Sequence, residues 1–350
     1  MTIALYTNII SPHQVPFAKE LIRRIGAENF RYVFSESLHA DRISLGWDVK
    51  NSDQILMVRD ESGEAKRWLN EADIVISGIR ALDLFEARSK RGKKTFYSAE
   101  RWFKPLSTSS GMCIRLPGIL RMLVPSYRRM AKRMVRLLNE DTNFHCLPIG
   151  VWAREDMARL GVREEKMTTW GYFVEPGAIA DAVDVREYGC AATKVLWVGR
   201  MLRLKNVDVL IRAVKSLGHV ELTLVGDGPE KYRLMKMAGG CNNIVFLPPV
   251  AIDKVREIMR AHNVYVFPSN EYDGWGAVVS EAMEEGMIVL GSNQAGAPAT
   301  MLPESHRFDC WDYRRLAQLL RDAADSKLAK IPIGDWSATK AAERFLEMCK

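Results

Sequence analysis

The sequence predicts an α/β protein built from two doubly wound parallel sheets, one in each half of the chain. Short, nearly continuous apolar runs rich in β-formers recur along it, and helical stretches separate these runs. A turn-rich segment with little periodicity divides the two halves. Apolar strands that alternate with helices are typical of parallel sheets covered on both faces. At 350 residues the chain is long enough for two domains, each with its own core.

The expected strands follow one another at regular intervals. In the first half they cover residues 3–7, 31–34, 73–78, 95–99, 144–150 and 166–171. In the second half they cover residues 194–200, 221–228, 243–249, 263–269 and 287–293. The helix expected after residue 205 carries one apolar stripe that Gly218 ends, and the stripe consists of Val207, Leu210, Ile211, Val214 and Leu217.

The turn-rich segment covers residues 175–193 and sets the expected domain boundary near Glu187. We therefore expect Rossmann-like domains over residues 1–187 and 188–334, followed by a C-terminal segment over 335–350. Open α/β sheets bind ligands at the carboxyl ends of their strands. Two such domains joined by a linker are expected to face each other across a cleft.

Composition describes an ordinary globular protein, with 47% hydrophobic and 27% charged residues. No apolar run approaches the roughly 18–20 residues that span a bilayer. The first ten residues lack a basic leader, so they indicate a first strand and not a signal peptide. The six cysteines include no CxxC pair, which favours reduced thiols in a cytoplasm over a disulfide framework.

The net charge of +7 is unevenly distributed. Between Arg88 and Arg136 the sequence has fourteen Lys or Arg and a single acid, Glu100. Such a field favours an anionic partner, which could be a membrane, a nucleic acid or a phosphorylated substrate; a solvated basic face is the alternative. Residues 125–138 would form an amphipathic helix suited to an anionic bilayer. Its basic face consists of Arg128, Arg129, Lys132, Arg133 and Arg136, and its apolar face of Met130, Met134, Val135 and Leu138.

Two cations follow the first strand of the second half. Arg200 ends the run "VGR", and Lys205 stands where the next helix begins. A guanidinium grips phosphate oxygens bidentately and an ammonium acts as a point charge, so the two suit a diphosphate. The alternative is that both are surface residues.

A glycine-rich stretch, "DGWGAVVSEAMEEG", leads into a helix later in the second half. The backbone N–H groups of Gly276, Ala277 and Val278 would form an anion site. Asp273 before the helix and Glu281 within it could each accept hydrogen bonds from hydroxyls, as a nucleotide sugar would require. The alternative makes Asp273 a helix cap and Glu281 a solvated helix residue.

Four motifs of the second half occur in the order found in one enzyme family. They are "VGR" with a later Lys, "GDGP" at residues 226–229, "IVFLPPV" at 244–250, and "PS" followed by "DGWG" and "EA" at 268–282. Across residues 194–296 the chain resembles the donor domain of the large retaining family-4, or group 1, glycosyltransferases, which have the GT-B fold. That resemblance implies two Rossmann-like domains and a final helix that crosses back to the first domain.

The resemblance also implies roles for single residues. Arg200 and Lys205 would hold the donor diphosphate, Glu281 the ribose, and Asp273 hydroxyls of the transferred sugar. The catalytic set would be Arg200, Lys205 and Asp273. The donor-binding set would add Gly274, Trp275, Gly276, Ala277, Val278 and Glu281. The family usually has Glu where Asp273 stands, and the glycine pair expected after its first strand is replaced by "SPHQ".

Candidates on the acceptor side are fewer. His13 follows the first strand and could approach a diphosphate, and Glu100 follows the strand over 95–99 and could contact the acceptor. The alternatives are an ordinary loop histidine and an ion pair with a neighbouring cation. No HExxH motif or cysteine cluster is present, so no metal and no other cofactor is expected. No GxGxxG motif follows a strand, which argues against a dinucleotide oxidoreductase.

The sequence therefore predicts a metal-independent retaining glycosyltransferase. It would transfer a sugar from a nucleotide-diphosphate sugar to a hydroxyl of a glycan or lipid-linked acceptor. The resemblance to the family implies that the product is part of a bacterial surface polysaccharide or glycolipid. The expected location is the cytoplasm, with peripheral contact between region 88–136 and an anionic membrane and no nucleic-acid partner. Two alternatives stay open: a non-catalytic nucleotide-sugar-binding protein on the same fold, and a basic nucleic-acid-binding protein.

Overall fold

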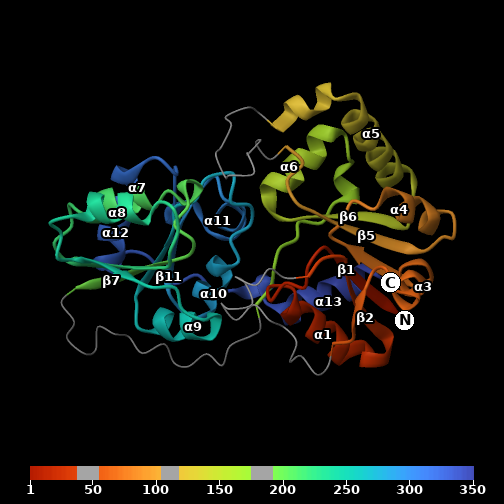
Figure 1. The fold of residues 1–350 in the computed structure, drawn as a ribbon, viewed down its shortest axis with the longest axis horizontal. Coiled ribbons are helices and arrows are strands. Elements are labelled where there is room, and N and C mark those ends of the chain that lie inside the picture. Colours follow the sequence, from red (N-terminus) through yellow and green to blue (C-terminus); the bar gives the residue numbers. More distant parts are fainter. Residues whose placement is uncertain (38–54, 104–117, 175–191) are drawn as a thin grey trace. The chain divides into compact units, whose positions relative to one another are not determined.

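The computed structural model describes residues 1–37, 55–103, 118–174 and 192–350, which form two compact α/β units (Figure 1). Unit 1 contains the first half of the chain together with Asp335–Lys350. Unit 2 contains the second half as far as Gly334. The boundary predicted near Glu187 lies outside the described residues and stays a prediction.

Unit 1 is built on a six-stranded parallel sheet in the order β3-β2-β1-β4-β5-β6. Its strands are β1 (Ile3–Thr7), β2 (Phe30–Phe34), β3 (Met57–Arg59), β4 (Ile74–Ser77), β5 (Lys94–Ala99) and β6 (Phe144–Pro148). Its helices are α1 (Val15–Ile25), α3 (Gly63–Glu71), α4 (Leu82–Ser89), α5 (Pro125–Glu140), α6 (Gly150–Leu160) and α13 (Ala338–Met348). The strand order reverses between β1 and β4.

Helices cover both faces of the unit 1 sheet because successive strand residues point to opposite sides. On β5, the Phe96 ring centre lies 4.8 Å from that of Phe345 in α13. The next residue, Tyr97, lies 5.9 Å from Phe85 in α4, between ring centres. Strand residues that are buried on both sides explain the nearly continuous apolar runs in the sequence.

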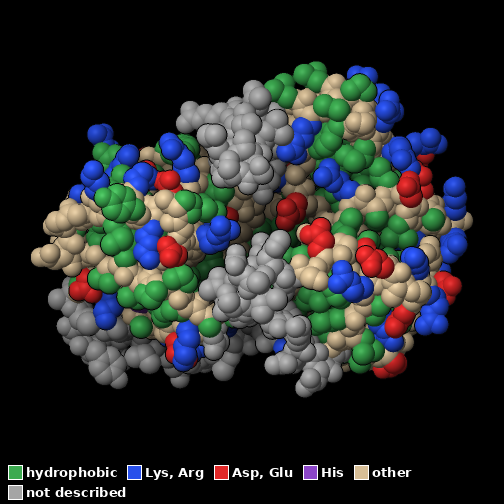
Figure 2. All heavy atoms as spheres, viewed as in Figure 1, with side chains coloured by type: hydrophobic (Ala, Val, Ile, Leu, Met, Phe, Trp, Pro, Cys, Tyr) green, Lys and Arg blue, Asp and Glu red, His purple; other side chains and the backbone are tan. Residues whose placement is uncertain are grey.

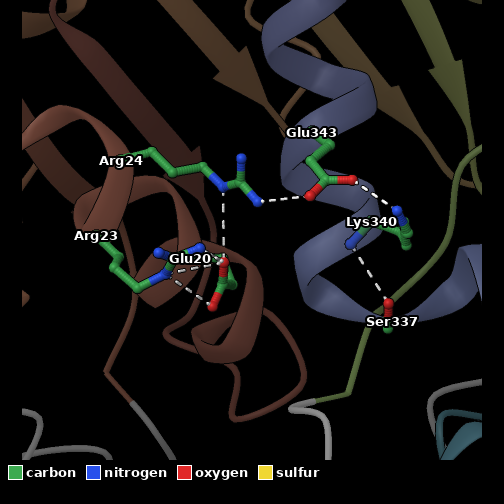
Figure 3. A network of polar contacts seen from close by, with 6 residues as sticks. All are labelled: Glu20, Arg23, Arg24, Ser337, Lys340 and Glu343. Carbon is green, nitrogen blue, oxygen red and sulfur yellow. Dashed lines mark hydrogen bonds and ion pairs between the residues drawn. The ribbon is translucent and has the colours of Figure 1, made fainter.

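The C-terminal helix α13 packs against α1, so the predicted return of the chain to its first half is confirmed. Phe345 is fully buried, and its ring centre lies 5.8 Å from that of Phe17 in α1. Figure 3 shows the polar margin of this contact, where Arg24 donates to Glu343 at 3.0 Å. Ser337 caps α13 by accepting from the Lys340 N–H at 3.3 Å.

Unit 2 has a second six-stranded parallel sheet, in the order β12-β11-β10-β7-β8-β9. Its strands are β7 (Thr193–Val198), β8 (Val220–Val225), β9 (Ile244–Leu247), β10 (Val264–Phe267), β11 (Ile288–Ser292) and β12 (Arg307–Phe308). Its helices are α7 (Val207–Val214), α8 (Lys231–Ala238), α9 (Ile252–Arg260), α10 (Val278–Glu284), α11 (Gly296–Met301) and α12 (Tyr313–Ala324). The stripe predicted from Val207 to Leu217 is buried in the core of this unit.

Two details differ from the sequence prediction. Residues 166–171 are not a strand, because Glu164–Lys166 is a 3-10 turn and only isolated bridges follow at Met167 and Trp170. The edge strands β3 and β12 were not predicted, since three and two residues are too few for a periodic pattern.

Candidate active site

The sheet of unit 2 reverses its strand order between β7 and β10, and the predicted donor-site residues follow these two strands. Arg200 and Lys205 come after β7, whereas Asp273 and Glu281 come after β10. Open α/β sheets bind ligands at such a reversal, beyond the carboxyl ends of the strands. The fold thus brings two segments about seventy residues apart to one edge of one sheet.

Lys205 and Asp273 form a direct ion pair. The Lys205 Nζ donates to both carboxylate oxygens of Asp273, at 2.7 Å each. The same Nζ lies 5.6 Å from the centre of the Phe267 ring. The side chains are largely buried, with exposed fractions of 20% for Lys205 and 11% for Asp273. The sequence motifs predicted neither this contact nor the mutual neutralisation that follows from it.

A backbone contact joins the same two loops. The Asn270 N–H donates to the Leu204 carbonyl at 3.0 Å, and the Asn270 Oδ1 accepts from the Tyr272 N–H at 3.1 Å. Ser269 is fully buried, and among the described residues its Oγ finds no hydrogen-bond partner. Sequence reasoning assigned no role to Asn270, although it directly follows the Pro-Ser pair of the fourth motif.

Arg200 leaves β7 through a turn that is fixed by the neighbouring "GDGP" turn. The Met201 N–H donates to the Asp227 carbonyl at 2.7 Å. Gly226 has φ +142°, and a Cβ there would lie 1.9 Å from the Gly199 carbonyl oxygen. Only glycine permits this close approach of the two turns. The Arg200 side chain is exposed, and no hydrogen bond or ion pair joins it to any other described residue.

The loop before α10 requires its two glycines. Gly274 and Gly276 have φ of +79° and +89°, and a Cβ on Gly276 would lie 2.4 Å from the Phe267 ring. The Gly274 carbonyl accepts from the Gly296 N–H at 2.8 Å, which fixes the loop to the start of α11. Trp275 between the glycines is buried. The glycine-rich stretch is therefore a rigid, close-packed loop.

Gly276 and Ala277 directly precede the helix α10, which begins at Val278. Within the described part of the chain, none of the backbone N–H groups of these three residues donates a hydrogen bond. Ala277 is the N-cap residue, and α10 has no side-chain cap. The alternative that made Asp273 a helix cap is therefore wrong, because its carboxylate pairs with Lys205 instead.

Glu281 lies in the first turn of α10 and is largely buried. Burial raises the pKa of its carboxyl above the ordinary value; the charge of Arg256 lowers it and that of Glu285 raises it further. Arg256 itself pairs with Glu285, at 3.0 Å. The alternative of a solvated helix residue at this position is therefore wrong.

The acceptor-side candidates come together in unit 1. The Tyr172 O–H donates to the Glu100 Oε1 at 3.0 Å, and the ring centres of Tyr172 and His13 lie 6.5 Å apart. Burial, and then the charge of Glu100, raise the pKa of Tyr172 well above its ordinary value. A small pocket beside His13 and Tyr172 is also lined by Leu5, Gln14, Ile76, Ser98 and Trp170. Sequence reasoning missed Tyr172, which lies in the segment "WGYFVEP".

The basic region 88–136 begins with a buried residue that belongs to no surface. Arg88 donates to the carbonyls of Leu69, Ala72 and Lys94 at 2.9, 3.0 and 2.7 Å, and to the Thr95 Oγ1 at 3.0 Å. Burial lowers its pKa to about 10. Arg88 therefore stabilises the packing of α4 on the sheet and adds nothing to a basic face.

The remaining observations concern metal ligands, membrane spans and thiols within residues 1–37, 55–103, 118–174 and 192–350. There, no group of three or more His, Cys, Asp or Glu side chains is placed to hold a metal ion. No helix in the same ranges is long and apolar enough to cross a bilayer. Four cysteines are described, and each is a free thiol: Cys146, Cys241, Cys310 and Cys349.

Sequence comparison identifies a family for unit 2. Residues 192–323 match the profile of a family described as glycosyl transferases group 1. A D-inositol 3-phosphate glycosyltransferase of Mycobacteroides abscessus is 29% identical over 174 residues, which cover 44% of this chain and 39% of the relative. The sulfoquinovosyl transferase SQD2 of Arabidopsis thaliana is 32% identical over 110 residues, 31% of this chain and 21% of the relative. The matches thus span well under half of these relatives' length.

Solved structures extend the similarity to the whole fold. HepE of Anabaena, solved in complex with UDP, has a TM-score of 0.72 at 15% identity, covering 99% of both chains. The lipopolysaccharide outer core galactosyltransferase WaaB has a TM-score of 0.68 at 14% identity, covering 99% of this chain and 98% of the other. At such identities the likeness establishes the fold alone.

Two doubly wound units of six parallel strands, with the final helix returned to the first, define the GT-B class of protein. Within that class, residues 192–323 match the group 1 glycosyltransferase family, in the half of the chain where the four motifs predicted the resemblance.

Proposed function

We propose that this chain is a retaining glycosyltransferase that takes a sugar from a nucleotide-diphosphate donor and transfers it to an acceptor hydroxyl. The proposal rests on the arrangement of side chains at the edge of the unit 2 sheet where β7 and β10 end. There the exposed Arg200, the Lys205–Asp273 pair and the unbonded N–H groups of α10 lie on adjacent loops. Cationic and N–H donors next to acceptor carboxylates suit a diphosphate flanked by hydroxyl-bearing groups.

In this proposal Lys205 changes partners when the donor binds. Asp273 neutralises Lys205 in the free protein. A diphosphate, which carries more negative charge than one carboxylate, would draw the Lys205 ammonium away and release the Asp273 oxygens for sugar hydroxyls. Arg200 and the N–H groups of Gly276 to Val278 would share the remaining phosphate charge. As the glycosidic bond breaks, these preformed donors would stabilise the leaving diphosphate.

The nucleoside end of the donor would be read by Glu281. Its carboxylate is largely buried, and burial raises its pKa, so it gains from any hydroxyl donor that enters the site. Two ribose hydroxyls would supply such donors. The buried Trp275 would act indirectly, since it holds the glycine loop in place.

The acceptor hydroxyl would bind at the carboxyl edge of the unit 1 sheet. Three side chains lie there, from the segments that follow β1, β5 and the isolated bridge at Trp170: His13, Glu100 and Tyr172. Glu100 accepts from Tyr172 and is otherwise exposed, so it has lone pairs left for an incoming hydroxyl. We propose His13 and Glu100 as acceptor contacts and Tyr172 as the residue that positions Glu100.

The relatives suggest the setting of the reaction. Their names include a D-inositol 3-phosphate glycosyltransferase, a sulfoquinovosyl transferase and a GDP-mannose-dependent alpha-(1-6)-phosphatidylinositol monomannoside mannosyltransferase, and HepE was solved with UDP-glucose. We propose a glycan or lipid-linked acceptor and a product that is part of a bacterial surface polysaccharide or glycolipid. The enzyme would work in the cytoplasm, peripherally at the inner face of the membrane.

The proposal is tested by nucleoside diphosphate release from a panel of nucleotide sugars in the presence of membrane lipid extract. Arg200→Ala and Lys205→Ala should each reduce turnover by at least ~100-fold, the scale of losing a preorganised charge-stabilising donor. Arg212→Ala is the matched control, because it removes a cation of unit 2 that pairs on the helix surface with Asp208. Release should persist in EDTA, since the donor site itself supplies the cations.

Three results would contradict the proposal. Donor binding without release, for any sugar and acceptor, would indicate a non-catalytic binding protein. Variants at Arg200 and Lys205 that keep activity within threefold of Arg212→Ala would remove these residues from the site. Loss of activity in EDTA with recovery in Mg²⁺ or Mn²⁺ would overturn metal independence.

A further inference from the structure

The turn that precedes α5 exposes apolar side chains in close succession. The 3-10 turn η3 (Gly118–Leu123) packs against α5, and Pro125 begins the helix. The exposed apolar residues, with their exposed fractions, are Leu123 at 79%, Ile119 at 50%, Val124 at 50% and Leu120 at 39%. We call these four residues the apolar tip. In Figure 2 hydrophobic side chains gather at the top of the view, where Figure 1 draws the segment before α5.

Unpaired cations surround the apolar tip. Arg121 lies within η3, and Arg128, Arg129 and Lys132 are exposed on the first turns of α5. None of these four forms an ion pair with an acid in the described ranges. No Asp or Glu occurs between Glu100 and Glu140, so these cations have no acid close to them along the chain.

The basic face of α5 has fewer unpaired cations than the amphipathic pattern predicted, because two of its five cations pair with acids. Arg133 donates to Glu86 and Asp83 of α4, at 2.9 Å each. Arg136 donates to Glu140 at 2.9 Å, one turn further along the same helix. These two cations are partly neutralised, so the free positive charge is concentrated at the end of α5 that carries the apolar tip.

The opposite face of α5 holds the surface in place. Ala131, Met134 and Leu138 are buried in the core of unit 1, and Met130 and Val135 pack against that core. The Tyr127 O–H also donates to the Trp102 carbonyl at 2.9 Å. The apolar tip and its cations are therefore presented on a fixed helix and are not available to the core.

We infer that the apolar tip inserts into the interface of an anionic bilayer while Arg121, Arg128, Arg129 and Lys132 bind lipid headgroups. Aliphatic side chains at a bilayer interface gain by leaving water, and basic residues gain from the negative surface potential. A nucleic acid fits less well, because it would match the cations but leave the aliphatic side chains facing water or phosphate. This inference rests on the peripheral location proposed above and specifies which residues would contact the membrane. It depends on no step of glycosyl transfer.

The test is sedimentation of the purified full chain with lipid vesicles. Wild type should bind phosphatidylcholine–phosphatidylglycerol vesicles at least ~10-fold more tightly than phosphatidylcholine vesicles, since each basic residue contributes about fivefold at an anionic surface. The triple variant Arg128→Ala/Arg129→Ala/Lys132→Ala should lose that preference. Leu123→Ser/Val124→Ser should weaken binding to the anionic vesicles by about tenfold, because the insertion of apolar side chains is lost.

A matched control distinguishes binding through this surface from nonspecific adsorption through any exposed apolar side chain. Tyr232→Ser removes a side chain that is 82% exposed on α8 of unit 2, and it should leave vesicle binding unchanged. All altered side chains are exposed, so each variant should keep the melting temperature of the wild type.

The inference is overturned if wild type binds both kinds of vesicle equally or binds neither, or if the triple and double variants both bind like wild type. It is also overturned if the triple variant loses binding to duplex DNA while vesicle binding stays unchanged. Failure of nucleoside diphosphate release with vesicle binding intact would contradict the proposed function and not this surface.

Discussion

Asp273 and Glu281 lie eight positions apart in the sequence. The surroundings of Asp273 stabilise its negative charge, whereas those of Glu281 disfavour one. Asp273 has a cation against both of its oxygens. Glu281 is held in a largely buried turn where burial raises the pKa of the carboxyl. The same pair of acids, at the same edge of one sheet, should therefore respond differently when each charge is removed.

Removing the charges should change stability in opposite directions. Asp273→Asn leaves Lys205 without its carboxylate and should lower the free energy of unfolding by about 1–3 kcal/mol. Glu281→Gln should raise it at neutral pH, because an ionised side chain with a raised pKa opposes folding. The Gln variant's advantage should shrink as the pH falls towards 4.5, the ordinary value for Glu, and vanish below it, where Glu281 is protonated in both states.

Urea unfolding of both variants and wild type, at neutral and acidic pH, checks this contrast. Wild type is its own control, since only the sign of each change matters. A Gln variant that is less stable than wild type at neutral pH would mean that the Glu281 charge is compensated in the fold. An Asn variant as stable as wild type would mean that the Lys205–Asp273 pair contributes nothing.

The helix α13 (Ala338–Met348) packs on the rest of unit 1. An aromatic contact and an ion pair attach it, and they differ in burial. Phe345 is fully buried against Phe17 and Phe96, whereas Glu343 pairs with Arg24 at the surface (Figure 3). Burial of aromatic area stabilises far more than an exposed ion pair.

Phe345→Ala should therefore lower the free energy of unfolding of unit 1 by about 3–5 kcal/mol, because it leaves a cavity between α1, α13 and β5. Glu343→Gln, two residues away on the same helix, should leave the melting temperature nearly unchanged. Calorimetric melting of both variants measures the difference. Equal effects of the two substitutions would show that α13 is held by its polar margin.

The periodic apolar runs of the sequence predicted most of both sheets. They succeeded where a strand is long and buried on both faces, as for the strands that contain Phe96 and Trp197. They failed at 166–171, where two isolated bridges at Met167 and Trp170 replace the strand. Local alternation cannot tell a paired strand from an extended segment that makes single bridges.

The candidate site was only partly predictable for a related reason. Strand ends and glycine spacing located Arg200, Lys205, Asp273 and Glu281, because these depend on local sequence. The Lys205–Asp273 pair and the Tyr172–Glu100 hydrogen bond join residues 68 and 72 positions apart. Such contacts depend on strand order, which no motif in one loop specifies. The four motifs predicted both the family and the fold. Residues 192–323 match the group 1 glycosyltransferases, and the similarity to HepE confirms the fold.

We propose that unit 2 binds the two ends of a nucleotide sugar with two different acids, and titration calorimetry can separate the two contacts. UDP, GDP and their hexose derivatives would be titrated into wild type, Glu281→Gln and Asp273→Asn. Glu281→Gln should weaken the free nucleoside diphosphate and the complete donor alike, by roughly 10- to 100-fold, as expected for a charge-assisted hydrogen bond. Asp273→Asn should weaken only the complete donor and should preserve or increase affinity for the free nucleoside diphosphate, because it releases Lys205. Unchanged affinities throughout, or a loss of nucleoside diphosphate affinity in Asp273→Asn, would contradict the claim.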